Sequence, residues 1–339
     1  MRFKVLINPE AGEGRGRRIV PELKKLFYKD NLEFEPYETE KPQELSKMAA
    51  AAEKEEFDCV VAVGGDGTVR RVIDGIRGSS MKLAIIPVGL VNAFAKSLKI
   101  PTNIRQAIPI LRKAHLKKAD IGIMARQMVP DKGRVDLSDG DAFEDDIEET
   151  VFVSALTIGP SFLLDDHIKA VETDRNKRLF HILRALSSQF MNYSFPELNI
   201  SIIPYDSEAA TAATEEERIE QEMAQEARAE KFIGTSLIIN NVSSQHNDFQ
   251  LAWDATASGG FLEAGFLTTS SKMDYLKFMY HTLFTGNYRE LPFLSRHRAA
   301  SVKVNSLAPG VVLKLDREEF GTLPFAARIE PQAIEVVVK

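Results

Sequence analysis

Cysteine is almost absent from this sequence. The single residue Cys59 among 339 excludes a disulfide framework and a cysteine-based zinc finger. The six histidines are scattered and show no paired metal-ligand spacing. No apolar run approaches the roughly 18–20 residues that span a bilayer. Because the first expected strand begins at Arg2, we expect no signal peptide. The chain also lacks a basic stripe with interleaved aromatic residues, which argues against nucleic-acid binding.

The charge of the chain is balanced overall but unevenly distributed. It carries 43 basic and 49 acidic side chains, and 44% of its residues are hydrophobic, which excludes a wholly disordered chain. Residues 1–120 hold 22 basic and 16 acidic side chains. Two later stretches, 136–149 and 208–231, carry eight acidic side chains each and at most three basic ones. We interpret these stretches as solvated insertions, whereas a mildly basic first third suits an anionic ligand.

Strands and helices alternate in the first third of the chain. Strands are expected at 2–7, 33–37, 58–63 and 83–87, and helices at 17–28, 42–55, 69–76, 91–98 and 103–114. Continuously apolar strands such as DCVVAV are typical of a sheet that is covered on both faces. The alternation therefore predicts an α/β domain with a doubly wound parallel sheet over residues 1–120.

After about residue 118 the pattern changes to short runs of β-branched and aromatic residues with few helices. Strands are expected at 151–158, 198–203, 232–240, 249–253, 265–269, 300–304, 311–315 and 333–338, and helices around 176–191 and 272–285. This pattern predicts a mostly antiparallel β-sandwich over residues 121–339, with the two acidic stretches as insertions. The length of the chain suits two domains, each large enough to bury a core.

The most informative turn is Gly64-Gly65-Asp66-Gly67-Thr68, which lies between a buried strand and a helix. Glycines allow a tight turn that brings backbone N–H groups close to a ligand, and a helix N-terminus favours phosphate. An acid among such donors can orient a hydroxyl, accept its proton or act on a metal ion. The alternative is that Asp66 only caps a helix. The turn is not a Walker loop, because G-x-x-x-x-G-K-S/T is absent.

Two other turns follow neighbouring strands. Residues 8–18 are rich in glycine and could form an anion nest, with Arg15, Arg17 or Arg18 neutralising phosphate, or could be a flexible loop with solvated arginines. Residues 87–95 follow the strand LAIIP. All three turns are expected at the carboxyl ends of parallel strands, where open α/β sheets bind their ligands.

The combination of NPEAG, GGDGT and IIPVGLVNAFAKSLKIP resembles the diacylglycerol, sphingosine and ceramide kinase family of lipid kinases. LFTGNYRELP and the closing DREEFGTLPFAARIEPQAIEVVVK fall in the family's order, so the resemblance covers nearly the whole chain. It implies an N-terminal nucleotide domain and a C-terminal β-sandwich, with ATP and Mg²⁺ bound in the cleft between them. A lipid hydroxyl would attack the γ-phosphate of ATP.

The resemblance also implies roles for single residues. Asp66 would orient or deprotonate the acceptor hydroxyl or act on Mg²⁺, and Asp316 and Glu318, the acids of the family's D-G-E signature, would lie near the catalytic centre. The nucleotide-binding residues would be Asn8, Gly12, Arg15, Gly64, Gly65, Gly67, Thr68, Gly89 and Asn92. No metal ligand is assigned, because the acids of the family's structural Mg²⁺ site are replaced around Ser258-Gly259.

Three residues depart from the family pattern and leave two hypotheses open. Leu90 removes a hydroxyl that can donate to phosphate, Arg71 replaces a glutamate, and Arg317 replaces the glycine of D-G-E. The chain is either an active lipid kinase for diacylglycerol, a sphingoid base or a related lipid, or a catalytically weak or inactive member that binds nucleotide or lipid and acts as a regulator. NAD kinases also carry GGDGT, but the NPEAG start and the closing segment disfavour them.

We expect a cytoplasmic protein that contacts membranes peripherally and that could form a homo-oligomer. Residues 274–284 and 190–195 are rich in aromatic residues and methionine, and could touch acyl chains or belong to the core. The basic cluster Arg175, Lys177 and Arg178 could face anionic headgroups or water. Cys59 lies inside an apolar strand and is predicted to be inert core.

Overall fold

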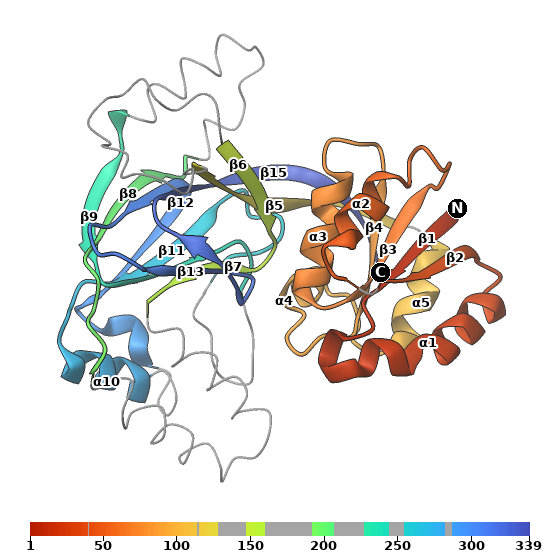
Figure 1. Ribbon diagram of the computed structural model, residues 1–339, viewed down its shortest axis with the longest axis horizontal. Coiled ribbons are helices and arrows are strands. Elements are labelled where there is room, and N and C mark those ends of the chain that lie inside the picture. The colour runs from red at the N-terminus through yellow and green to blue at the C-terminus, as the bar shows by residue number, and fades with distance from the viewer. Residues whose placement is uncertain are drawn as a thin grey trace.

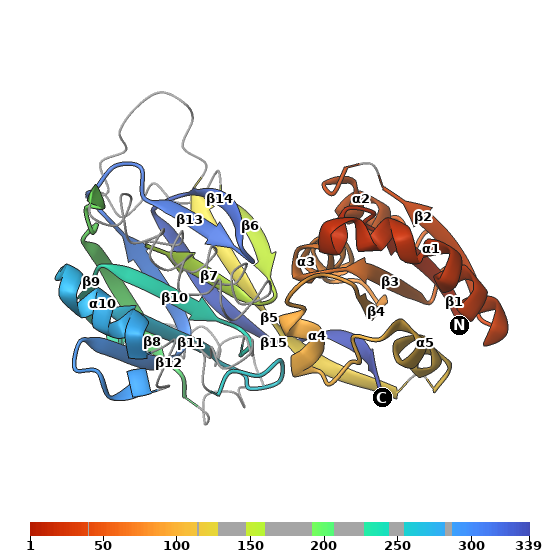
Figure 2. The same cartoon turned by 90° about the horizontal axis from the view of Figure 1, so that it is seen from below.

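The chain folds into an α/β domain and a β-sandwich that share two long strands (Figures 1 and 2). A computed structural model describes residues 1–39, 41–113, 115–127, 147–159, 192–206, 227–243, 254–281 and 287–339. The expected helix at 176–191, the expected strand at 249–253 and the basic cluster at 175–178 lie outside these residues. None of the described helices has the length and apolar character needed to cross a membrane.

The α/β domain is built on a parallel sheet. Its strands are β1 (Arg2–Ile7), β2 (Glu33–Glu38), β3 (Cys59–Gly64) and β4 (Lys82–Pro87). Its helices are α1 (Ala11–Lys29), α2 (Glu44–Ala50), α3 (Asp66–Ile76), α4 (Ala93–Ser97) and α5 (Ile104–Lys113). The strand order is β2-β1-β3-β4, and all of these pairs are parallel. The expected doubly wound parallel sheet is therefore confirmed.

Alternating side chains of the strands fill a separate core on each face of this sheet. On one face, Val5 and Ile7 pack with Leu23 of α1 and with residues of α5. On the other face, Leu6 packs with Ile73 and other residues of α2 and α3. Cys59 is fully buried in the α1 core, and burial raises the pKa of its thiol, as expected for an inert core residue.

The described strands of the second half form a sandwich with antiparallel pairing. They are β5 (His115–Gln127), β6 (Ile147–Phe152), β7 (Ala155–Ile158), β8 (Leu198–Pro204), β9 (Glu230–Gly234), β10 (Ser236–Asn240), β11 (Leu262–Leu267), β12 (Leu294–Asn305), β13 (Val312–Leu315), β14 (Glu318–Thr322) and β15 (Phe325–Val338), with helices α10 (Lys272–Tyr280) and η3 (Asn287–Glu290). One layer runs β14-β13-β7-β10-β11-β12 and the other β9-β8-β12-β15-β5-β6, so β12 belongs to both. The expected mostly antiparallel β-sandwich is confirmed.

Several strand ends differ from the expectations. The run 151–158 is divided into β6 and β7, because the backbone at Val153 and Ser154 turns to donate hydrogen bonds to the carboxylate of Asp316. Strands β9 and β10 are separated at Thr235, where the chain passes from one layer to the other. Strand β6 begins at Ile147 and β9 at Glu230, so the last residues of both acidic stretches belong to paired strands.

Strands β5 and β15 connect the two domains. Strand β15 pairs with β5 on one side along its whole length. On its other side, its first half pairs with β12, and Val336 in its last half pairs in parallel with Leu83 of β4. The C-terminal end of the chain therefore lies in the α/β domain, beside its sheet (Figure 1). The proposed domain boundary at residue 120 falls inside β5, and the end of β15 returns to the sheet of the α/β domain.

Candidate active site

The turns that follow β1, β3 and β4 contact one another at the carboxyl edge of the parallel sheet. A Cβ atom on Gly89 would lie 2.5 Å from the Cα of Gly65, so the second and third turns touch through their backbones. Gly12, in the first turn, has a φ of +61°, and a Cβ atom there would lie 2.1 Å from the carbonyl oxygen of Val88. Side chains at these glycines would separate the turns, which explains why the three turns can form one continuous surface.

Asn8 connects the glycine-rich turn after β1 to the N-terminal turn of helix α3. Its Nδ2 donates to Oγ1 of Thr68 at 3.0 Å, and its Oδ1 accepts from the backbone N–H of Glu10 at 3.1 Å. The Thr68 side chain in turn packs over Gly64, where an added Cβ atom would lie 2.2 Å from Oγ1 of Thr68. The motif residues Asn8, Gly64 and Thr68 therefore form one packed unit under the glycine turn.

The carboxylate of Asp66 caps α4, a neighbouring helix, and does not cap its own. Its two oxygens accept from the backbone N–H groups of Ala93 and Phe94, both at 3.0 Å. Each oxygen keeps a second lone pair. Burial of the carboxyl raises the pKa of Asp66, and the two amides, with the nearby cations Arg317 and Lys96, offset this only in part. A carboxylate with a raised pKa is a better proton acceptor than an ordinary one.

Asn92 presents a buried acceptor that has no hydrogen-bond partner among the described residues. The residue is only 5% exposed and has a left-handed backbone, with φ of 54°. Its Nδ2 donates to the carbonyl of Gly89 at 2.7 Å, whereas its Oδ1 accepts no hydrogen bond. An unsatisfied buried acceptor costs about 1–3 kcal/mol, so this oxygen is well suited to accept a hydrogen bond from a ligand.

The hairpin between β13 and β14 brings Asp316 from the sandwich to the α/β domain. The Asp316 carboxylate accepts from the backbone N–H groups of Val153, Ser154 and Ala155 at 3.1, 2.7 and 3.1 Å. Burial raises the pKa of Asp316 to about 6, although Arg70 and these amides lower it. The carboxylate thus fastens the hairpin to the connection between β6 and β7.

Arg317, which stands at the glycine position of the family signature, has a left-handed backbone conformation that favours glycine. Asp316 and Arg317 both have positive φ, 47° and 75°, as a two-residue hairpin turn with right-handed strand twist requires. The replacement of glycine therefore does not prevent the turn from forming. Its side chain is exposed, and its charge lowers the pKa of Asp66.

Glu318 forms ion pairs with two arginines of α3. Its carboxylate accepts from Arg70 at 2.9 Å and from Nη1 of Arg71 at 3.1 Å, with a second contact from Arg71. Burial alone would raise the pKa of Glu318, but Arg71 and Arg70 outweigh it, so the pKa is lowered. The arginine that replaces the family's glutamate is therefore the partner of the signature acid, and the pair joins the two domains beside Gly67.

The structure brings most of the candidate residues together. Asn8, Gly12, Gly64, Gly65, Asp66, Gly67, Thr68, Gly89 and Asn92 lie at the carboxyl edge of the sheet, and Asp316 and Glu318 approach α3 from the sandwich. Arg15 is exposed, with its side chain beside Gly12. Arg70 was not a sequence candidate, although a basic residue on the buried face of α3 was a usable signal. Within the described residues, no three His, Cys, Asp or Glu side chains cluster to hold a metal ion.

Two family models match the chain. One, described as the Diacylglycerol kinase catalytic domain, matches residues 2–124, and the other, described as the YegS C-terminal NAD kinase beta sandwich-like domain, matches residues 198–338. The diacylglycerol kinases of Staphylococcus saprophyticus and of Staphylococcus aureus strain MRSA252 are each 35% identical to the chain over 125 residues. These matches cover 36% of the chain and 41% and 40% of the relatives, so they span about two fifths of the relatives' length.

Solved structures share the fold over the whole chain. One from Bacillus anthracis str. Sterne has a TM-score of 0.64 with 16% identity, and covers 100% of this chain and 98% of its own. The crystal structure of a diacylglycerol kinase from the same organism has a TM-score of 0.60, with 16% identity and coverage of 100% and 97%. The chain joins a kinase domain, which carries the three glycine turns, to a β-sandwich, and this combination defines the class of protein. Within that class, residues 2–124 belong to the lipid kinase family of the Diacylglycerol kinase catalytic domain, and residues 198–338 match the accompanying sandwich domain.

Proposed function

We propose that the protein is an ATP-dependent lipid kinase that transfers the γ-phosphate to a hydroxyl of diacylglycerol, a sphingoid base or a related lipid. The observation that carries the proposal is the meeting of three glycine turns around Asp66, next to the unpartnered Oδ1 of Asn92. Membership of the lipid kinase family supports the reaction class. The identity of the acceptor lipid and the use of ATP and Mg²⁺ belong to this proposal.

The phosphates of ATP would lie on the glycine turn, at the N-terminal end of α3. Backbone N–H groups and the helix dipole favour anions at such a position. Oδ1 of Asn92 is an acceptor, so it would receive a hydrogen bond from an amino or hydroxyl group of the nucleoside. Arg15, which is exposed beside the first turn, would neutralise phosphate charge.

Mg²⁺ would supply charge neutralisation on the phosphates. This ion is commonly held by one or two carboxylates together with substrate phosphates and water. Asp66 fits this role, because both of its oxygens keep a lone pair after accepting the amides of Ala93 and Phe94. Asp316 fits less well, because three backbone N–H groups already occupy its carboxylate.

In the proposed reaction Asp66 receives the proton of the acceptor lipid. The hydroxyl oxygen forms a bond to the γ-phosphorus while the bond from that phosphorus to the β–γ bridging oxygen breaks, and ADP leaves. The raised pKa of Asp66 suits proton acceptance. The cationic side chain of Arg317 would stabilise negative charge that spreads over the transferred group. Glu318, held by Arg70 and Arg71, would position the hairpin that carries Arg317.

A second candidate function is that of a nucleotide- or lipid-binding regulator without appreciable turnover. The observation that favours it is the neutralisation of Glu318 by two arginines, which lowers its pKa and keeps it from acting as a base. Leu90, which replaces a hydroxyl residue in the third turn, also favours the regulator function. In this case nucleotide would bind without phosphate transfer.

Access to lipid in a membrane would be peripheral. On α10, Met273 and Tyr280 are 61% and 55% exposed and share one helix face with the exposed Lys277. An exposed apolar pair suits contact with a bilayer surface, whereas Lys277 pairs with Asp274 at 3.0 Å and adds little net charge. We also propose that the protein is cytoplasmic and reaches its lipid substrate from there, at the membrane surface.

Substitution of the central acid tests the proposal. Purified protein is incubated with Mg²⁺ and γ-labelled ATP and with vesicles that contain diacylglycerol, sphingosine or ceramide. We expect transfer to one of these lipids, and Asp66→Asn should reduce kcat by about 10²–10⁴, the usual contribution of a general base, with binding of metal-free ATP retained. The control is Asp74→Asn, an exposed acid on the same helix. Binding of Mg·ATP without transfer to any lipid would favour the regulator, and undiminished transfer by Asp66→Asn would exclude the role of Asp66.

A further inference from the structure

Arg70 is a cation among the buried, mostly apolar residues of α3. The helix buries Val69, Val72, Ile73 and Ile76, and Arg70 itself is only 6% exposed. Burial of an unpaired cation is costly, so a buried arginine is normally accompanied by acids that pair with it. The acids that pair with Arg70 belong to the sandwich, at the other end of the sequence.

The guanidinium of Arg70 bridges the two acids of the β13–β14 hairpin. Its Nη2 donates to Oε2 of Glu318 at 2.9 Å, and its Nε lies 3.8 Å from Oδ2 of Asp316. These two acids flank Arg317 in the sequence, so Arg70 holds the turn on both sides of that residue. The planar fork of an arginine can face two carboxylates at once, a geometry that the compact ammonium group of lysine does not reproduce.

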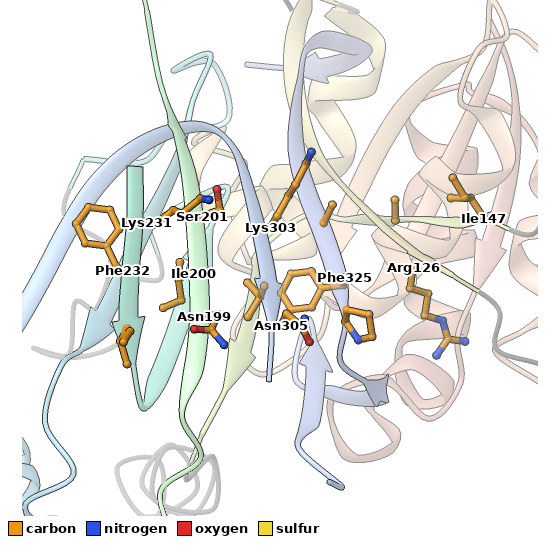
Figure 3. Close-up of a pocket in the computed structure, with 15 residues that line it drawn as sticks. Arg126, Ile147, Asn199, Ile200, Ser201, Lys231, Phe232, Lys303, Asn305 and Phe325 are labelled. Carbon is orange, nitrogen blue, oxygen red and sulfur yellow. The ribbon is translucent and has the colours of Figure 1, made fainter. Parts of the chain in front are cut away.

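Phe320 of β14 gives the hairpin a third contact with Arg70. The centre of its ring lies 5.9 Å from Cζ of Arg70 and 4.9 Å from Cζ of Arg126 in β5. Arg126, which also lines a pocket of the sandwich (Figure 3), donates from Nη1 to the carbonyl of Phe320 at 3.2 Å. It is held in turn by the carboxylate of Glu148. Phe320 therefore contacts one arginine on α3 and a second, fixed arginine on β5.

The hydrogen bonds of Arg70 indicate that it does more than stabilise the fold. Its Nε has no hydrogen-bond partner among the described residues, because 3.8 Å to Asp316 is beyond the range of an N–H···O bond. A buried donor without a partner lowers stability. The guanidinium therefore lies where its charge reaches both acids, although it forgoes one hydrogen bond there.

Arg71, the adjacent arginine, contacts the hairpin less completely. It donates to Glu318 at 3.1 Å and to the carbonyl of Gly67 in its own helix at 3.0 Å. Its side chain is 16% exposed, compared with 7% for Arg70. Among the described residues, Arg71 pairs with Glu318 but not with Asp316, so Arg70 is the one of the two that joins both acids.

We propose that Arg70 is a positioning residue for phosphate transfer. By bridging Asp316 and Glu318 it fixes the turn between them, and this turn carries Arg317. The cation of Arg317 is close enough to Asp66 to act on its carboxylate. Without the bridge the hairpin loses its attachment to α3, and Arg317 is no longer held beside the reacting groups. This inference rests on the proposed lipid kinase function, because it assigns Arg70 to the same site.

Steady-state kinetics with Mg·ATP and lipid vesicles test the effect on transfer. Arg70→Met removes the charge but keeps a long side chain, and we expect kcat to fall about 10²-fold, as a misplacement of about 1 Å can cause, with the KM for ATP little changed. Arg70→Lys restores the charge without the fork and should recover only part of kcat. Arg71→Met leaves the contact with Asp316 in place and should lower kcat less. The control is Arg112→Met, at an exposed position of α5, which should keep the kcat of the unmodified chain.

A distance measurement tests the positioning independently of activity. Spin labels on Lys29→Cys of α1 and Glu319→Cys of β14, both at exposed positions, report the separation of the hairpin from the α/β domain by electron–electron double resonance. The fully buried Cys59 should not react with the label. We expect one narrow distance distribution with Arg70 present and a broader one in Arg70→Met. Glu318→Gln removes the acid from the more exposed side of the pair, so it should also broaden the distribution and gives the same test if Arg70→Met fails to fold.

The two measurements separate this inference from the lipid kinase proposal. If the unmodified chain transfers no phosphate to any lipid, the kinase proposal fails, and the distance distributions then decide whether Arg70 fixes the hairpin. Unchanged kcat in a folded Arg70→Met variant would overturn the role of Arg70. A lower kcat with unchanged distance distributions in both Arg70→Met and Glu318→Gln would overturn it as well, because the hairpin would then be held without the bridge.

Discussion

At the scale of single residues, the candidate site depends on how one carboxylate is held. The N–H groups of Ala93 and Phe94 fix the position of the Asp66 carboxylate, while burial raises its pKa. The capping role and the proposed catalytic role are thus compatible, because the amides use one lone pair of each oxygen. Arg317, which replaces glycine in the family signature, lowers the same pKa.

This arrangement predicts the pH dependence of phosphate transfer. Asp66 accepts a proton only when ionised, so kcat/KM should rise with pH through its pKa, which lies above the ordinary value of 3.8. Arg317→Gln should move this rise to higher pH, because the cation that lowers the pKa is lost. The measurement is a pH–rate profile, with Arg105→Gln on the exposed side of α5 as control. A profile that is identical for Arg317→Gln and the unmodified enzyme would show that Arg317 does not act on the titrating group.

At the scale of elements, the β13–β14 hairpin positions the residues that the sandwich contributes. Asp316 is fastened by three backbone N–H groups and Glu318 by two arginines of α3, so both ends of the two-residue turn are held. The intervening Arg317 has a φ of 75°, where a side chain is sterically unfavourable. The turn is therefore strained at its centre and fixed at its ends.

Replacement of Arg317 by glycine should therefore stabilise the protein. We expect Arg317→Gly to raise the free energy of unfolding by about 0.5–1 kcal/mol, since relief of the left-handed strain exceeds the extra entropy of glycine in the unfolded chain. Urea unfolding measures the change. Arg317→Ala keeps the Cβ atom, so it should give no gain. An equal gain from alanine would mean that the charge of Arg317, and not its backbone, destabilises the turn.

The elements that sequence predicts well are those whose signals are local. The alternation in the first third predicts β1 to β4 and the convergence of their glycine turns, because strand ends in a parallel sheet share an edge. Strand β5 was not expected, since its first residues, His115–Lys118, are all exposed and mostly polar and hide the alternation. The contacts of Arg70 and Arg71 with Glu318 join residues almost 250 positions apart, and no local pattern specifies such a pair.

At the scale of the whole molecule, the two domains are joined by shared strands and by ion pairs. Arg77, which directly follows α3, bonds to Glu149 of β6 and to Glu330 of β15, and Arg328 also contacts Glu149. These partly exposed pairs contribute little each, about 0.2–1 kcal/mol. The shared strands contribute more, because β15 pairs with β12 in the sandwich and with β4 in the α/β domain. Substitutions in the C-terminal end of β15 should therefore change the stability of the nucleotide turns.

The last strand provides a direct test of this coupling. Val336 is fully buried in the core formed by α2 and α3, although sequence pattern assigns it to the sandwich. Val336→Ala should lower the free energy of unfolding by about 2 kcal/mol, because it removes two buried methyl groups and leaves a cavity. Amide hydrogen exchange should then quicken in β3 and β4, which carry the glycine turns. Val312→Ala, at a 44% exposed position of β13, should leave exchange in β3 and β4 unchanged. Faster exchange confined to the sandwich in Val336→Ala would show that the last strand does not stabilise the nucleotide domain.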